Sequence, residues 1–303
     1  MVNAAAALRP RPAERRLMTR TPVRRELVTS ADGTKLAVTV TGDGPPLVVC
    51  PGSLATARDW QMVARALAPR LTTWALDRRG HGSSGDDPAY SLDREQDDLA
   101  AVVGLAAASH PGSGPDGVTL LGHSYGGLIA LALTRRLAGT ALEPARLVLY
   151  EPPLALDRLP GGGALPGFAR AVAAGDRDQA LAIGLREFVR MPDEAIAGMR
   201  GQPIWARLSG MTPGWTREIA ALDDYCADLA GDLGRFATLP VPVLLLVGEL
   251  SPPWLTAASR RLAQLLPDVT VAELPGQAHD AHVFAATTVA DRIARFVLGA
   301  GDL

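Results

Sequence analysis

A serine lies at the centre of the segment Gly122-His123-Ser124-Tyr125-Gly126, which directly follows a short apolar run. The pattern G-x-S-x-G is typical of a serine held at the tip of a sharp turn between a strand and a helix. Glycines are favoured there because the helix folds back close to the strand that precedes it. The pattern therefore predicts Ser124 as a nucleophile, with the backbone N–H of Tyr125 directed at a developing oxyanion.

The segments around this serine alternate between strand-like and helix-like periods. Continuous apolar strands separated by amphipathic helices predict a parallel sheet that helices cover on both faces. A turn at Ala31-Asp32-Gly33 predicts an opening antiparallel hairpin. The predicted strands span residues 26–29, 36–41, 47–50, 72–76, 118–121, 146–150, 241–247 and 269–274.

Four acidic residues belong to a helix that is predicted over residues 92–107, with Ser91 as its N-terminal cap. The polar face of this helix is expected to carry Asp93, Glu95, Asp97 and Asp98. A last helix is predicted over residues 283–298.

The alternation stops over residues 153–239, where helical stretches are punctuated by proline and glycine and no convincing strand occurs. A segment of this length is too long for a plain loop in a compact domain. We expect a helical cap over the carboxyl ends of the strands, where ligands bind in open α/β sheets. A structural excursion away from the site is the alternative. The predicted organisation is an α/β core over residues 23–152 and 240–303, this cap, and a mobile tail over residues 1–22.

Three segments, in this order, resemble motifs of the α/β-hydrolase superfamily. Asp77-Arg78-Arg79-Gly80-His81-Gly82-Ser83-Ser84-Gly85 is similar to the loop after the fourth strand of that family, and residues 122–127 are similar to its nucleophile elbow. Leu274-Pro275-Gly276-Gln277-Ala278-His279 is similar to the loop that presents the catalytic histidine. The resemblance covers nearly the whole chain after residue 22. It implies a mostly parallel eight-stranded sheet flanked by helices, with a helical cap inserted after strand six.

The resemblance also implies that His279 is the base that takes the proton of Ser124, since a serine hydroxyl alone is a poor nucleophile. His282 lies three residues further along and is the alternative base. His81 and His123 occupy motif positions where the family tolerates a histidine for structural reasons.

The acid that should orient this histidine departs from the usual family pattern. Most relatives carry an aspartate at the position of Ser251, and a serine cannot stabilise an imidazolium as a carboxylate does. Glu151 is the predicted acid because it directly follows strand six, whose carboxyl end lies beside that of strand seven in this fold. Haloalkane dehalogenases and zearalenone-type lactonases also carry the acid after strand six. The alternatives are Glu249, Asp280, Asp223 and Asp224.

The oxyanion hole needs a second N–H group besides that of Tyr125. In the family this donor follows a His-Gly pair after strand three, and this chain has Pro51-Gly52-Ser53 there. The backbone N–H of Ser53 is therefore the candidate donor, and the loss of the usual histidine does not remove it.

These residues together predict a cofactor-free serine hydrolase that cleaves a carboxylic ester or lactone of a small to medium, largely apolar substrate through an acyl-enzyme. The candidate substrate-binding residues in the cap are the aromatic side chains Trp205, Trp215 and Tyr225. Such side chains can equally form the core of the cap. A lyase or carbon–carbon bond-cleaving enzyme on the same fold, and a non-catalytic ligand-binding relative, are the alternatives.

The composition of this 303-residue chain limits the classes of molecule that it is expected to bind. A formal net charge of −2 implies no polyanionic partner such as a nucleic acid. No apolar stretch approaches the length of a membrane span, and the spacing of histidines and cysteines predicts no metal site. We expect a cytoplasmic monomer or homodimer that acts on a small molecule and uses no metal or other cofactor. Cys50 and Cys226 are expected to be buried free thiols.

Overall fold

Eight strands form one sheet in the order β1-β2-β4-β3-β5-β6-β7-β8 in the computed structural model, which describes residues 23–110 and 117–299. The pairs β1–β2 and β2–β4 are antiparallel, and all other neighbours are parallel. The predicted fold class is confirmed, whereas the predicted tail over residues 1–22 lies outside the described residues. The strands are β1 (Val23–Thr29), β2 (Lys35–Thr41), β3 (Pro46–Cys50), β4 (Thr72–Leu76), β5 (Thr119–His123), β6 (Arg146–Tyr150), β7 (Val243–Gly248) and β8 (Val269–Leu274).

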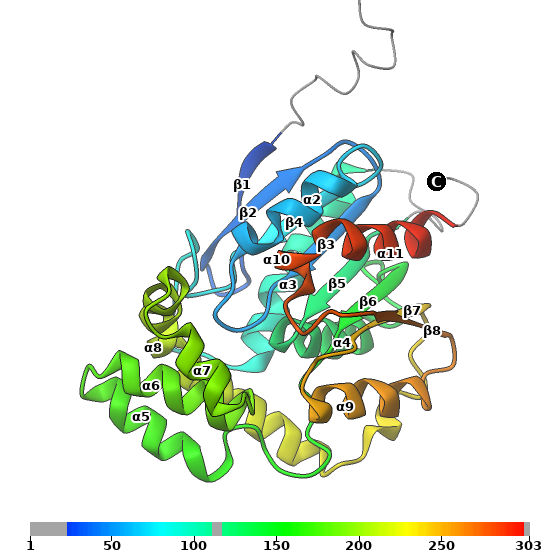
Figure 1. Cartoon of the computed structure of the whole chain (residues 1–303). Coiled ribbons are helices and arrows are strands. Elements are labelled where there is room, and N and C mark those ends of the chain that lie inside the picture. Colours follow the sequence, from blue (N-terminus) through cyan, green and yellow to red (C-terminus); the bar gives the residue numbers. More distant parts are fainter. Residues whose placement is uncertain (1–22, 111–116, 300–303) are drawn as a thin grey trace, which may run out of the picture.

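Two apolar layers cover the sheet because side chains of successive strand residues point to opposite faces. Val49 of β3 packs in the layer that contains α2 (Gln61–Leu67) and α11 (Ala286–Leu298). Val48 packs in the opposite layer, with α3 (Leu92–Ser109), α4 (Tyr125–Leu137) and α9 (Pro253–Ala263). Figure 1 shows α2 and α11 on the near face of the sheet and α3 and α4 behind it. Every residue of β3, β4, β5 and β7 is buried, as expected for strands covered on both faces.

The N-terminus of α3 agrees with its predicted cap, because the Ser91 side chain accepts a hydrogen bond from the N–H of Arg94 at 3.2 Å. The predicted polar face of this helix is wrong for two of its four acids. Glu95 and Asp98 are fully buried. Each of them pairs with a buried arginine of the loop after β4, which compensates the loss of hydration of the carboxylate.

Between β6 and β7 the chain forms a group of helices, called the cap below, which lies at the lower left of Figure 1. The cap helix α8 is 27 residues long and contains Pro213, which removes one backbone donor from the helix interior. The Thr212 hydroxyl donates to the freed carbonyl of Ser209 at 2.8 Å, so the helix continues through the proline. The elements are η2 (Gly162–Ala164), α5 (Leu165–Ala173), α6 (Arg177–Ile183), η3 (Gly184–Phe188), α7 (Asp193–Met199), α8 (Pro203–Leu229) and η4 (Leu233–Phe236).

The last predicted helix is divided into α10 (Ala281–Phe284) and α11. Ala285 lies between them with φ −134° and ψ 44°, outside the helical region. At the start of α10, the N–H of Ala281 donates to the hydroxyl of Tyr150 at 3.2 Å. Cys50 and Cys226 are buried free thiols, as predicted. In the described part of the chain, no helix has both the length and the apolar character needed to cross a membrane.

Candidate active site

The candidate nucleophile Ser124 joins the end of β5 to the start of α4. Its backbone has φ +52° and ψ −126°, a strained conformation for a residue other than glycine. The N–H of Ser124 donates to the carbonyl of Tyr150 at 2.9 Å, which ties the turn to the end of β6. A Cβ atom at Gly126 would lie 2.2 Å from the carbonyl oxygen of Cys50, so only glycine allows this close packing of the helix on β3. The turn predicted from the G-x-S-x-G pattern is therefore present.

Glu151 and His279 contact each other across the carboxyl ends of β6, β7 and β8. The Oε2 atom of Glu151 lies 2.6 Å from Nδ1 of His279. Its other oxygen, Oε1, accepts a hydrogen bond of 2.7 Å from the N–H of Gly248, the last residue of β7. The Glu151 side chain is 0% exposed and the His279 side chain is 21% exposed. Glu151 also has a positive φ of 48°, so the acid, like the serine, sits on strained backbone.

Three of the other acids considered from the sequence have partners elsewhere or face solvent. The Oε2 atom of Glu249 accepts a hydrogen bond of 2.7 Å from the N–H of Gly276. Asp223 accepts from the N–H of Gly161 at 2.9 Å, within the cap. Asp224 is exposed. The structure therefore brings Glu151, and none of these three, to the ring of His279.

Ser251 and Asp280 both lie close to the loop that carries His279. Asp280 directly precedes α10. Ser251 is buried, and a Cβ atom at Gly248 would lie 2.4 Å from its Oγ atom. The usual acid position of the family is therefore adjacent to the backbone that holds Glu151.

The backbone of the histidine loop is held by two aromatic side chains that the sequence did not single out for this task. The hydroxyl of Tyr150 donates to the carbonyl of Ala278 and accepts from the N–H of Ala281. Nε2 of His123 lies 2.9 Å from the carbonyl oxygen of His279 and must carry the proton that it donates. The sequence offers one signal that these two residues lie near the site: Tyr150 directly precedes Glu151, and His123 directly precedes Ser124.

His282, the alternative base, is buried in a ring cluster. Its ring stacks on that of Trp60, with a centroid distance of 4.7 Å and an interplanar angle of 15°. Burial, together with the neighbouring His279, lowers the pKa of His282 to about 3. Burial also lowers the pKa of His123 well below its usual value, and the rings of His282 and His279 add to this effect. Both buried imidazoles are therefore neutral at neutral pH.

The loop after β3 passes directly over the nucleophile. A Cβ atom at Gly52 would lie 2.8 Å from Cβ of Ser124, so the close approach requires glycine. The guanidinium group of Arg78 donates to the carbonyl oxygens of Pro51 and Gly52, at 3.0 and 3.2 Å. The proposed N–H donor of Ser53 lies in this loop, and that of Tyr125 begins α4. Their role in an oxyanion hole stays a prediction.

The two tryptophan candidates of the cap contact other cap residues. The indole N–H of Trp205 donates to Asp178 at 2.7 Å. Trp215 packs edge-on against Phe188, with a centroid distance of 5.4 Å. Tyr225 is partly buried against the main apolar core. Both tryptophans therefore help to hold the cap together, and contact of the three residues with a substrate stays a prediction.

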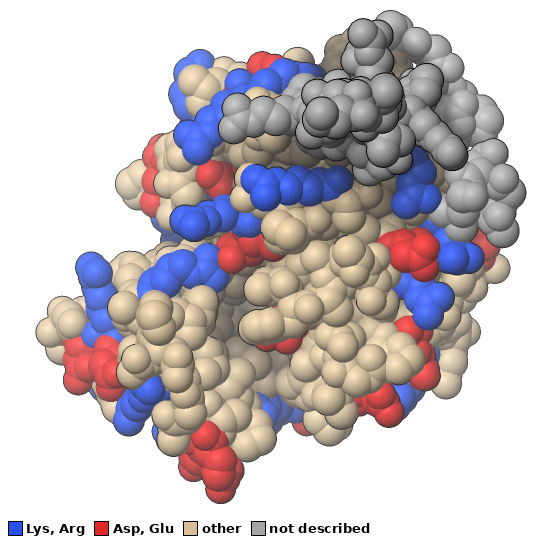
Figure 2. Space-filling model, turned by 45° about the horizontal axis from the view of Figure 1, so that its top comes forward, with Lys and Arg blue, Asp and Glu red and all other residues tan. Residues whose placement is uncertain are grey.

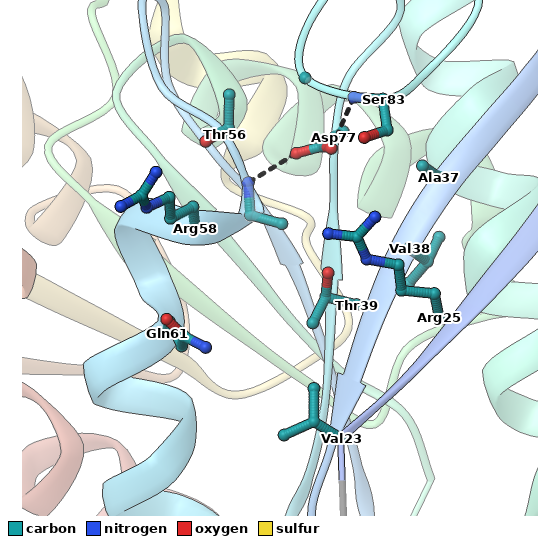
Figure 3. Close-up of a pocket in the computed structure, with 12 residues that line it drawn as sticks. Val23, Arg25, Ala37, Val38, Thr39, Thr56, Arg58, Gln61, Asp77 and Ser83 are labelled. Carbon is teal, nitrogen blue, oxygen red and sulfur yellow. Dashed lines mark hydrogen bonds between the residues drawn. The ribbon is translucent and has the colours of Figure 1, made fainter.

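A separate groove of about 650 Å³ lies beside β1, β2 and the short helix η1 (Ala57–Trp60). Figure 3 shows Arg25 and Arg58 on its two sides. Asp77 accepts hydrogen bonds there from the N–H groups of Ala57 and Ser83, at 2.8 and 2.9 Å, and so joins the two loops. None of its lining residues belongs to the pair of Glu151 and His279 or to the turn at Ser124.

Figure 2 shows basic and acidic side chains interspersed over one face of the molecule.

The sequence and the fold of this chain are similar to those of known proteins. A sequence model described as the alpha/beta hydrolase family matches residues 47–292. The 2-(acetamidomethylene)succinate hydrolase of Mesorhizobium japonicum is 26% identical over 254 residues, which are 78% of this chain and 82% of that protein. Lipase LipV of Mycobacterium tuberculosis is 35% identical over 100 residues, 33% of this chain and 34% of the lipase. The crystal structure of an alpha/beta hydrolase from Sphaerobacter thermophilus has a TM-score of 0.73 at 29% identity, covering 88% of this chain and 100% of that one. Because the family match extends over most of the sequence, the chain belongs to the alpha/beta hydrolase family.

Proposed function

We propose that this hydrolase cleaves a carboxylic ester or lactone of a small to medium, largely apolar substrate through an acyl-enzyme on Ser124, without a cofactor. The observation that carries the proposal is the 2.6 Å contact between Glu151 and His279, in which the acid is fully buried. A buried carboxylate held in this way can orient an imidazole and stabilise its protonated form. The similarity to a curated hydrolase and a lipase supports hydrolytic chemistry.

The first chemical step transfers a proton from Ser124 to His279. Because Nδ1–H of His279 donates to Glu151, the lone pair of the imidazole resides on Nε2, which accepts the proton from the serine Oγ. The Oγ atom then forms a bond to the substrate carbonyl carbon, and the carbonyl oxygen becomes an oxyanion. Glu151 stabilises the imidazolium that results, without taking its proton.

The second part of the reaction uses the same groups in reverse. The imidazolium gives its proton to the leaving oxygen, and the bond between that oxygen and the carbonyl carbon breaks. Water then attacks the acyl carbon and gives a proton to Nε2 of His279, which is the general base. The bond between the acyl carbon and Ser124 Oγ breaks, the imidazolium returns its proton to Oγ, and the carboxylic acid is released. The N–H groups of Ser53 and Tyr125 are the proposed donors to the oxyanion in both halves.

The test is detection of the acyl-enzyme. We expect a burst of p-nitrophenol when the protein is mixed with p-nitrophenyl butyrate, and an acyl adduct on Ser124 by mass spectrometry. Ser124→Ala should unfold at nearly the same temperature and show neither signal. Turnover of a substrate without any adduct would instead favour elimination or carbon–carbon cleavage. A folded wild-type protein that turns over no ester, lactone or amide, the last including 2-(acetamidomethylene)succinate, would favour a ligand-binding protein.

A further inference from the structure

A cluster of four buried charged or titratable side chains lies where the cap meets the core, outside the acid–histidine pair. Its centre is Arg78, whose side chain is 0% exposed. Two guanidinium nitrogens of Arg78 donate to Glu95 of α3 at 2.7 Å and to Glu218 of the cap helix α8 at 2.8 Å. His81 also contacts the Oε1 atom of Glu218. Buried charges need such partners, so the cluster joins the loop after β4, helix α3 and the cap into one unit.

Arg78 also fixes the backbone next to the nucleophile. Its Nε and Nη2 atoms donate to two successive carbonyl oxygens, those of Pro51 and Gly52. The peptide unit is planar and trans, so the C=O of one residue and the N–H of the next point in opposite directions. A guanidinium that holds the carbonyl of Gly52 therefore also sets the direction of the N–H of Ser53. In the proposed mechanism this N–H is one of the two oxyanion donors.

Glu218 ties the same loop to the cap. Although burial by itself raises the pKa of a carboxyl group, Arg78 and His81 lower the pKa of Glu218 to about 2. The side chain of Ser53 adds a smaller contribution to this lowering of the pKa of Glu218. Glu218 is 1% exposed, so its charge is held by these neighbours rather than by water. The peptide that carries the proposed N–H donor is thus held by Arg78, and Arg78 is in turn held by a carboxylate of the cap.

We propose that Arg78 is a positioning residue for the oxyanion hole and that Glu218 makes cap helix α8 part of the same device. The inference rests on the proposed function, because an oxyanion forms only if Ser124 attacks a carbonyl group. Besides the backbone and the two carboxylates, Arg78 contacts His81 and lies over the ring of Tyr125. Its hydrogen bond to the carbonyl of Gly52 is the contact by which it acts on the Gly52–Ser53 peptide. A lysine cannot replace it, since one ammonium group lacks the planar fork of donors that spans these partners.

Arg79 provides a matched control on the same loop. It is as buried as Arg78, and it is paired with Asp98 at 2.7 Å and with Asp32 at 3.0 Å. Its described hydrogen bonds do not include residues 51–53. Arg79→Lys should therefore disturb folding about as much as Arg78→Lys while leaving the oxyanion loop in place.

The experiment measures the affinity of both variants for an aryl trifluoromethyl ketone. The ketone adds to Ser124: the Oγ–carbon bond forms, the serine proton passes to His279, and the ketone oxygen becomes an oxyanion in the hole. We expect Arg78→Lys to weaken this inhibitor and to lower kcat for p-nitrophenyl butyrate, each by about 10- to 100-fold, with KM changed less than about threefold. Arg79→Lys should change the inhibition constant and kcat by less than about threefold.

Equal effects of the two variants on the inhibition constant would overturn the inference. If Arg78→Lys does not fold, Glu218→Gln replaces it, because the neutral amide still accepts a hydrogen bond but no longer anchors the guanidinium charge. This variant should weaken the ketone about three- to tenfold, and an unchanged inhibition constant would refute the role of the cap. Failure of the proposed function is a distinct result, because the wild-type protein itself would then neither form the ester adduct nor bind the ketone.

Discussion

The two halves of the candidate site are held by different parts of the molecule. The acid–histidine half is built inside the core, where Glu151 is fixed by the end of β7 and the histidine loop by Tyr150 and His123. The proposed oxyanion half is the loop at Gly52 and Ser53, which is held by Arg78, and Arg78 is paired with a carboxylate of the cap.

Because different parts of the molecule hold the two halves, we expect different substitutions to affect proton transfer and stabilisation of the oxyanion. A disturbance of the cap should leave the contact between Glu151 and His279 in place, because every residue that holds this contact comes from the core strands and their loops. The same disturbance should reach the N–H of Ser53 through Glu218 and Arg78. Changes in the core half should therefore affect proton transfer, and changes in the cap should affect chiefly the oxyanion.

The largest effect is expected in the core half, from loss of the base. His279→Ala should lower kcat/KM for p-nitrophenyl butyrate by about 10⁴-fold or more, because Ser124 then has no proton acceptor. His282→Phe keeps an aromatic ring on Trp60 and should stay within about threefold of the wild type. Steady-state kinetics of both variants test the assignment of His279 as the base. A larger loss of kcat/KM in His282→Phe than in His279→Ala would instead identify His282 as the base.

The next largest effect concerns the attachment of the cap. Glu218→Ala should lower the free energy of unfolding by about 3–5 kcal/mol, since it leaves the charge of Arg78 without one of its buried partners. Arg207→Ala is the control on the same helix: Arg207 pairs with Asp59 at 2.8 Å, but its side chain is 41% exposed. Its loss should cost at most about 1 kcal/mol. Urea unfolding measures both values, and similar costs would mean that burial does not distinguish these two links to the core.

The buried imidazoles predict that the protein becomes less stable towards unfolding as the pH falls. The pKa of His282 is about 3 in the folded state, against about 6.5 for an unperturbed histidine. Between these values the unfolded chain binds a proton that the folded chain does not, so stability falls as the pH drops below about 6.5. Between about pH 7.5 and pH 5, the wild type should lose about 2 kcal/mol more than His282→Phe. Equal losses in urea unfolding at the two pH values would show that His282 is not the group responsible.

The smallest effect is expected from the hydroxyl that holds the histidine loop. Tyr150→Phe removes one donor to the carbonyl of Ala278 and one acceptor for the N–H of Ala281. We expect kcat to fall about tenfold and the free energy of unfolding to fall by about 1 kcal/mol. The affinity of Tyr150→Phe for the trifluoromethyl ketone should stay closer to that of the wild type than the affinity of Arg78→Lys does. A loss confined to ketone binding would contradict the separation of the two halves.

Much of the fold was predictable because local patterns determine it. Buried parallel strands are continuous apolar runs, and the turn at Ser124 needs small neighbours at fixed positions. The approach of Glu151 to His279 was predictable from topology, since strands six and seven are neighbours. The length of α8 was not, because Pro213 ordinarily ends a helix and is tolerated here through a side-chain bond from Thr212.

The buried charges could not be predicted from periodicity. Glu95 and Asp98 follow the pattern of an exposed helix face, yet two arginines of the loop that precedes α3 compensate their burial. Glu218 lies 140 residues from Arg78 in the sequence, so their pairing depends wholly on how the cap packs on the core. The one local signal of these buried pairs is that two arginines, Arg78 and Arg79, directly follow Asp77.

The most direct test of the site is relocation of the acid. Glu151→Ala should lower kcat/KM by about 10⁴-fold, because the imidazole loses its orientation and its counter-charge. Ser251 occupies the usual acid position beside Gly248, so adding Ser251→Asp to Glu151→Ala should recover at least about tenfold of that loss. Glu249→Ala, the control, should stay within about threefold of the wild type. An inactive Glu249→Ala together with an active Glu151→Ala would contradict the assignment of Glu151.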